Sequence, residues 1–156
     1  MSDRRDLRDL YQEVILDHGR HPRNRRAIAD CSHLAHGENL SCGDAEVVFL
    51  KIDDEGVIRD VAFDGQSCAI ATASASLMTE VLVGKTPAQA KSLFDRFHAL
   101  VTGGEEAPLD GMEVELERLT MLSGVRDHPV REKCATLAWQ TMMAALENPK
   151  TQRSLN

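Results

Sequence analysis

The chain has 156 residues, of which 42 % are hydrophobic and 28 % are charged, a composition typical of a globular domain rather than of a disordered or fibrous protein. The formal net charge of −7 argues against nucleic acid as the main partner. No apolar run approaches the ~20 residues that a membrane helix needs, and the charged N-terminus, MSDRRDLRDL, is unlike a signal peptide. We therefore expect one cytoplasmic domain over residues 1–156, with reduced cysteines and neither nucleic acid nor membrane as a partner.

The first predicted element is a helix over residues 4–18. Its apolar residues recur at helical spacing, and they are Leu7, Leu10, Tyr11, Val14 and Ile15. Gly19 is the predicted end of this helix, and Pro22 disfavours a restart. Residues 1–26 hold seven Arg against five Asp or Glu, a charge of +2 within an acidic chain. That surplus fits either a solvated helix surface or a docking face for an acidic partner.

Two strands are predicted over residues 45–52 and 57–64, and the sequence DDEG between them is typical of a turn. A third strand is expected around residues 33–40. Apolar and polar residues alternate in the 57–64 segment, which favours an antiparallel sheet with one exposed face.

Beyond Gly65 the sequence predicts helices. They cover residues 68–82, a segment that starts at Thr86 and Pro87, a segment around residues 116–122, and residues 130–146. Strands followed by helices indicate an α+β fold, in which about three antiparallel strands carry helices packed on one face.

Three of the four cysteines lie where a strand or a helix could direct a ligand. Cys42 and Asp44 flank a glycine just before a predicted strand, and residues i and i+2 of an extended chain point to the same side. Cys68 begins a predicted helix, whose N-terminus favours negative charge. Cys134 lies in the last helix, with Arg131 one turn earlier. The spacing is not that of a zinc finger, and a single buried cysteine is commonly a small hydrophobe, so the residues alone leave both readings open.

The remaining candidates are interpreted as structural or surface residues. Cys31 lacks a comparable setting. His33 and His36 are rival metal ligands, since histidine binds metals at neutral pH. Their H-x-x-H spacing would suit one turn of a helix, but this segment is not predicted to be helical.

Four motifs run through the chain in the order LYQEVILDHGRHPRNRR, NLSCGD, GQSCAIATASASLM and REKCATLAW. Together they resemble the SufU-type branch of the IscU/NifU-like iron–sulfur cluster assembly proteins, over nearly the whole length. Lys133 stands where IscU-type scaffolds have a histidine, and residues 85–121 resemble the insertion that distinguishes SufU-type members. One departure is Leu40, where the family usually has a proline before the CGD motif.

The resemblance implies that Cys42, Asp44, Cys68 and Cys134 bind Zn²⁺, and that Cys42 and Arg131, which matches the family's arginine near the last cysteine, are the catalytic residues. It implies a zinc-dependent sulfurtransferase that acts only with its partner, a SufS-type cysteine desulfurase dependent on pyridoxal phosphate. Cys42 would accept persulfide sulfur from that partner and pass it towards downstream iron–sulfur assembly proteins. Three thiolates and one carboxylate around Zn²⁺ leave a net charge that nearby cations would balance.

Three other functions can be weighed for the same residues. The first alternative is a scaffold on which a [2Fe–2S] cluster is assembled, with iron bound in place of zinc. The second is a purely structural zinc domain. The third, a zinc hydrolase, needs an open coordination position and a general base, and four protein ligands leave no such position. The position of Lys133 and the 85–121 segment favour sulfur transfer over the scaffold.

Overall fold

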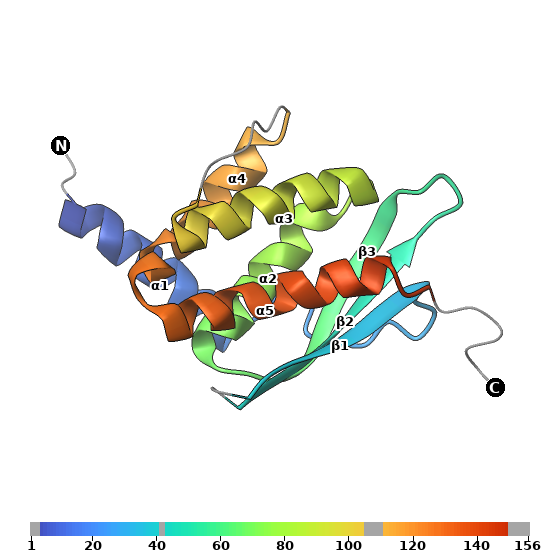
Figure 1. Cartoon of the computed structure of the whole chain (residues 1–156), viewed down its shortest axis with the longest axis horizontal. Coiled ribbons are helices and arrows are strands. Elements are labelled where there is room, and N and C mark those ends of the chain that lie inside the picture. The colour runs from blue at the N-terminus through green and yellow to red at the C-terminus, as the bar shows by residue number, and fades with distance from the viewer. Residues whose placement is uncertain (1–3, 41–42, 105–110, 150–156) are drawn as a thin grey trace.

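The computed structural model describes the backbone of residues 4–40, 43–104 and 111–149, together with their side chains except those of residues 4–11, 126 and 127. The elements are α1 (Arg4–Arg20), β1 (His33–Asn39), β2 (Asp44–Ile52), β3 (Ile58–Gln66), α2 (Ala69–Leu82), α3 (Pro87–Thr102), α4 (Glu113–Leu119), the 3-10 helix η1 (Thr120–Asp127) and α5 (Pro129–Leu146). Figure 1 shows α5 running across the sheet, with the other helices gathered beside it. The predicted α+β fold is confirmed.

The sheet has the order β1-β2-β3, and both pairs of strands are antiparallel. The predicted third strand is therefore present as β1. Residues of β2 alternate between buried and more exposed positions, so Asp44 and Glu46 lie on the same inward side as Val48 and Leu50. This alternation directs two carboxylates at the start of β2 towards the helices.

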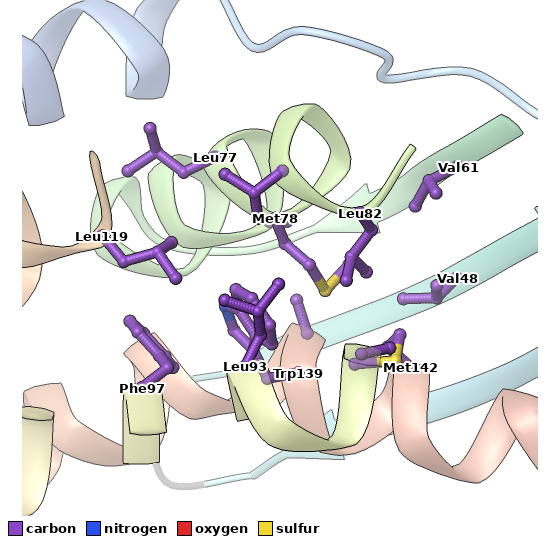
Figure 2. Packing of buried hydrophobic residues seen from close by; sticks show 14 of the residues in the cluster. Val48, Val61, Leu77, Met78, Leu82, Leu93, Phe97, Leu119, Trp139 and Met142 are labelled. Atoms are coloured by element: carbon purple, nitrogen blue, oxygen red, sulfur yellow. The ribbon is translucent and has the colours of Figure 1, made fainter. Parts of the chain in front are cut away.

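The main core lies between the sheet and the helices. α5 covers β1 and β2, whereas α2 packs against β3, α1 and α5. Phe97 of α3 stacks on Trp139 of α5 with ring centroids 4.8 Å apart, and Figure 2 shows Leu93 of α3 beside the two rings and Met78 of α2 across from them. Small residues along α2, such as Ala73 and Ala75, allow it to pack closely within this layer. The core thus holds α2 and α5, which carry two of the candidate ligands, in fixed positions.

The other face of the sheet is less exposed than the alternation predicted. The segment after α1 runs along β3, where Arg26 N–H donates to the carbonyl of Phe63 and Phe63 N–H donates to the carbonyl of Asn24. Ile28 and Cys31 from this segment form a small buried cluster with Ala62 and neighbouring residues of the sheet. The prediction missed this cover because residues 21–32 have no regular apolar period.

The sequence predicted that Gly19 ends α1. In the structure Gly19 lies inside the helix, which continues to Arg20. A Cβ atom at Gly19 would lie 3.4 Å from the carbonyl oxygen of Ala69, an ordinary van der Waals distance, so this position of α1 faces the start of α2. Among the described residues, none of the helices is long and apolar enough to cross a membrane.

Candidate metal centre

Asp44, Cys68 and Cys134 converge on one point. One carboxylate oxygen and two sulfur atoms, one from each residue, all lie within 4.8 Å of one another. Asp44 is the first residue of β2, Cys68 immediately precedes α2, and Cys134 lies in the second turn of α5. The N-terminal ends of these three elements all lie towards the lower left of Figure 1. Cys42, the fourth predicted ligand, lies outside the described residues and precedes Asp44 by two positions.

Asp44 connects the start of β2 to the start of α2. Its side chain is buried, and its Oδ1 atom accepts a 2.8 Å hydrogen bond from the backbone N–H of Cys68. The Oδ2 atom lies 4.0 Å from the Cys68 sulfur. One oxygen therefore fixes the backbone of Cys68, while the other faces its side chain.

Cys68 is the N-cap residue of α2, with the extended backbone that this position requires. Its sulfur accepts a hydrogen bond from the N–H of Ala71 at 3.4 Å. The first N–H groups of a helix have no partner within the helix, and they stabilise negative charge nearby. The local structure therefore suits a thiolate ligand at Cys68.

Cys134 is buried on the inward side of α5. Asn39, the last residue of β1, donates from Nδ2 to the Cys134 sulfur at 3.7 Å. The hydroxyl of Ser74 in α2 donates to the carbonyl oxygen of Ala135 at 2.5 Å. This contact ties the helix that follows Cys68 to the helix that contains Cys134.

The donor set fits a single zinc ion. Zinc binds thiolate sulfur at about 2.3 Å and carboxylate oxygen at about 2.0–2.2 Å, which places tetrahedral ligand atoms roughly 3.6–3.8 Å apart. The three donors lie within 4.8 Å of one another, so a small contraction would bring them to these distances. A fourth ligand would complete the tetrahedron, and the motif supplies Cys42 as the candidate.

A groove of about 440 Å³ is lined in part by residues that lie close in sequence to Cys68 and Cys134. Its walls come from α1, the start of α2, η1 and the first turn of α5. Ala69, which follows Cys68, lines one side, and Arg131, one turn before Cys134, lines another together with His128. Arg131 is exposed, so a cationic group lines this groove one helical turn before Cys134.

Glu46 is a candidate that the sequence analysis missed. It is 3 % exposed and lies two residues after Asp44 on the same face of β2. Burial raises the pKa of Glu46 to about 8, and the neighbouring Asp44 carboxylate adds to the rise, while the hydrogen bond from Ser67 opposes it. The alternation of β2 could have identified position 46 as facing inward.

His33 and His36 do not join the cluster of Asp44 and the two cysteines. Both lie on β1, where an odd spacing places them on opposite faces of the sheet, and therefore they cannot share one metal ion. His33 instead contacts the hydroxyl of Ser32 at 2.8 Å. Cys31 is buried in the apolar cluster on the outer face of the sheet, which agrees with its interpretation as a structural residue.

Comparison with known sequences gives a family match over most of the chain. The sequence profile described as the NifU-like N terminal domain matches residues 10–155. The chain is 36 % identical over 138 residues to the iron–sulfur cluster assembly scaffold protein IscU of Thermotoga maritima, which covers 88 % of this chain and 93 % of the relative. It is 35 % identical over 142 residues to the zinc-dependent sulfurtransferase SufU of Bacillus subtilis, and this match covers 91 % of this chain and 92 % of the relative.

A solved structure from Fervidobacterium islandicum has the same fold, with a TM-score of 0.78 and 31 % sequence identity. The match covers 86 % of this chain and 94 % of the Fervidobacterium chain. The Fervidobacterium protein is described as a candidate iron–sulfur cluster assembly scaffold protein for the SUF system. Two of these relatives are named as iron–sulfur cluster assembly scaffolds and one as a zinc-dependent sulfurtransferase.

Proposed function

The chain belongs to the NifU-like N-terminal domain family, whose relatives are named for iron–sulfur cluster assembly, and we propose that it serves this process as a zinc-dependent sulfur acceptor. Its partner in this role is a cysteine desulfurase that carries a persulfide, and its product is sulfur for downstream assembly proteins. The observation that carries the proposal is the meeting of Asp44, Cys68 and Cys134 within 4.8 Å.

Cys42 is the proposed acceptor because it precedes a buried ligand by two positions, next to a glycine with a positive φ of 70°. Its thiolate attacks the outer sulfur of the partner's persulfide. A new bond forms between the Cys42 sulfur and that outer sulfur, while the original S–S bond breaks and the partner cysteine leaves as a thiolate. The proton of the persulfide stays on the transferred sulfur or passes to water, and no external oxidant or reductant is needed.

Asp44, Cys68 and Cys134 are the residues proposed to hold zinc together with Cys42. Bound zinc would keep the thiols ionised and would not consume a persulfide, because Zn²⁺ has no redox chemistry. The chain's own contacts arrange these donors: Asp44 orients Cys68, and Asn39 donates to Cys134. Arg131, exposed one helical turn before Cys134, is proposed to attract the negatively charged persulfide.

The alternative role is a scaffold for a [2Fe–2S] cluster, with iron and sulfide as cargo on the same residues. The position before Cys134 favours transfer instead. Lys133 occupies this position. Its side chain is exposed and charged, and therefore offers no ligand to a metal at neutral pH, whereas the side chain of Cys134 is buried.

Metal analysis and a visible spectrum of freshly purified protein separate these two roles. A colourless protein with one zinc per chain is expected for the sulfur acceptor. A brown protein that contains iron and inorganic sulfide would instead support the scaffold. Repeating the analysis on Cys134→Ala tests the site itself, because the variant should lose the metal, while Cys31→Ala, outside the cluster, should keep it.

A further inference from the structure

Glu46 is buried without full hydrogen bonding. It is 3 % exposed, its Oε2 atom accepts a 3.3 Å hydrogen bond from the hydroxyl of Ser67, and its Oε1 atom has no hydrogen-bond partner among the described residues. An unpaired buried carboxyl oxygen is unfavourable for folding. The next two inward positions of β2 are filled by Val48 and Leu50, so the same face accepts apolar side chains.

The neighbouring strands leave this carboxyl without a flanking side chain. Glu46 pairs with Gly37 on β1 and with Gly65 on β3. A Cβ atom at Gly37 would overlap the hydroxyl of Thr141 in α5, and one at Gly65 would overlap the carbonyl oxygen of Ala45. The surroundings of Glu46 on the inward face therefore come from the helix layer and from the turn that leads into α2.

A chain of hydroxyl groups links Glu46 to that turn. If the Ser67 hydroxyl donates to Glu46, it accepts from the Thr72 hydroxyl, which lies 2.8 Å away. The backbone N–H of Thr72 donates to the carbonyl of Cys68 at 2.9 Å, which closes the first turn of α2. The carboxyl of Glu46 thus anchors the first turn of α2 from the side of the sheet.

Asp44 and Glu46 act on successive residues. Asp44 accepts from the N–H of Cys68, and Glu46 accepts from the side chain of Ser67, the residue immediately before it. Two inward carboxyl groups of one strand, spaced i and i+2, therefore hold two consecutive residues of the cap of α2. The Cys68 sulfur lies at this cap.

We propose that Glu46 is a positioning residue for the candidate metal centre: through Ser67 it fixes the cap of α2 and thereby the direction of the Cys68 sulfur. The inference rests on the proposed metal-binding function of Cys68. It explains why an incompletely bonded carboxyl is retained at a position that suits an apolar residue. Loss of a side chain that orients a metal ligand lowers metal affinity by about 10-fold to 100-fold.

The test compares Glu46→Leu, Glu46→Gln and Ser67→Ala with the unsubstituted protein. Zinc affinity is measured by competition with a chromophoric chelator, and the ligand geometry by the absorption spectrum of the Co²⁺-loaded protein. The thermal melt of the metal-free protein reports stability. We expect Glu46→Leu to weaken zinc binding and change the Co²⁺ spectrum, while its metal-free form melts at the wild-type temperature or higher.

Two further results are required. Glu46→Gln should restore both affinity and spectrum, because its amide oxygen can still accept from Ser67. Ser67→Ala should reproduce the loss, and adding Glu46→Leu to it should bring no further loss. Native affinity and a native Co²⁺ spectrum in Ser67→Ala would overturn the inference, even if Glu46→Leu failed to fold. Absence of zinc and cobalt binding by the unsubstituted protein would overturn the metal centre itself.

Discussion

The backbone N–H of Cys68 donates a 2.8 Å hydrogen bond to the Oδ1 atom of Asp44, so the first residue of β2 fixes the residue that caps α2. The Oδ2 atom of the same carboxylate lies 4.0 Å from the Cys68 sulfur. Asp44 therefore has two separable roles in this structure, one in the local fold and one as a candidate ligand.

Substitution of Asp44 should separate these roles. In Asp44→Asn the amide oxygen can still accept from Cys68, so the metal-free variant should unfold at a near-native denaturant concentration. The neutral amide is a poorer ligand, and zinc affinity should fall. Asp44→Ala also leaves a backbone N–H without its acceptor, and should lose about 1–3 kcal/mol of stability. Glu38→Gln, an exposed position on β1, is the control. Wild-type zinc affinity in Asp44→Asn would contradict the ligand role.

Zinc removal is expected to lower the melting temperature by many degrees. The donors of the cluster come from separate segments, and a bound metal would hold these segments together in the folded state only. Free zinc at one hundred times its dissociation constant adds about 2.7 kcal/mol to the stability of the native state. Calorimetry of zinc-loaded and chelator-treated protein measures the shift, which Cys134→Ala should abolish. Equal melting temperatures with and without zinc in the wild-type chain would refute this prediction.

Gly65 should be more sensitive to substitution than Gly84, although both have positive φ values, of 125° and 88° respectively. An alanine at either position carries the backbone strain, about 1–3 kcal/mol. Only at Gly65 would the added Cβ also overlap backbone, namely the carbonyl of Ala45; at Gly84 it meets nothing within 4 Å. Denaturant titration of Gly65→Ala and Gly84→Ala should therefore show the larger loss at Gly65. Equal losses would mean that β2 and β3 are less closely paired there than the structure describes.

His18 should make stability dependent on pH. It is 5 % exposed, and its Nδ1 atom lies 2.7 Å from the hydroxyl of Ser76. Burial lowers the pKa of His18 from its usual value near 6.5, the charge of Arg23 adds to this, and Glu80 opposes it. The unfolded chain therefore takes up a proton at a higher pH than the native state does. The contribution of His18 to stability is complete above about pH 6.5 and is lost as the pH falls below that value.

Metal-free protein provides the measurement for His18, because zinc release has a pH dependence of its own. The free energy of unfolding of His18→Asn should fall less steeply below about pH 6.5 than that of the wild-type chain. His21→Asn, at an exposed position just beyond α1, should retain the wild-type slope. A wild-type slope in His18→Asn would show that another group causes the acid sensitivity.

Local sequence patterns predicted the elements of this fold well, because each depends on neighbours in the chain. The alternation in β3, the turn between β2 and β3 and the start of a helix at Cys68 are of this kind. Gly19 was predicted to end α1 but lies one residue inside the helix, facing Ala69. A glycine at the end of an apolar pattern suggests a helix stop, whether or not the helix ends there.

The candidate site likewise has one part that local patterns predict and another that depends on tertiary packing. The positions of Asp44, Cys68 and Cys134 suggested ligands one at a time, but their convergence depends on the packing of α2 against α5 and the sheet. The resemblance to a known family supplied that grouping. Glu46 escaped notice because a charged residue in a strand ordinarily faces water. The alternation of β2 places position 46 on the inward face, and the helix layer over the start of β2 buries the side chain there.

The most direct test of the sulfur-acceptor proposal is the transfer of radiolabelled sulfur from cysteine, through a cysteine desulfurase, to the zinc-loaded chain. The wild-type chain and the control Cys31→Ala should both acquire label that a thiol reductant releases, and peptide mapping should place it on Cys42. Cys42→Ala should acquire none, although a near-wild-type melt of its metal-free form should show that it folds. Equal labelling of Cys42→Ala, or an unlabelled wild-type chain beside a desulfurase that is active on cysteine, would contradict the account.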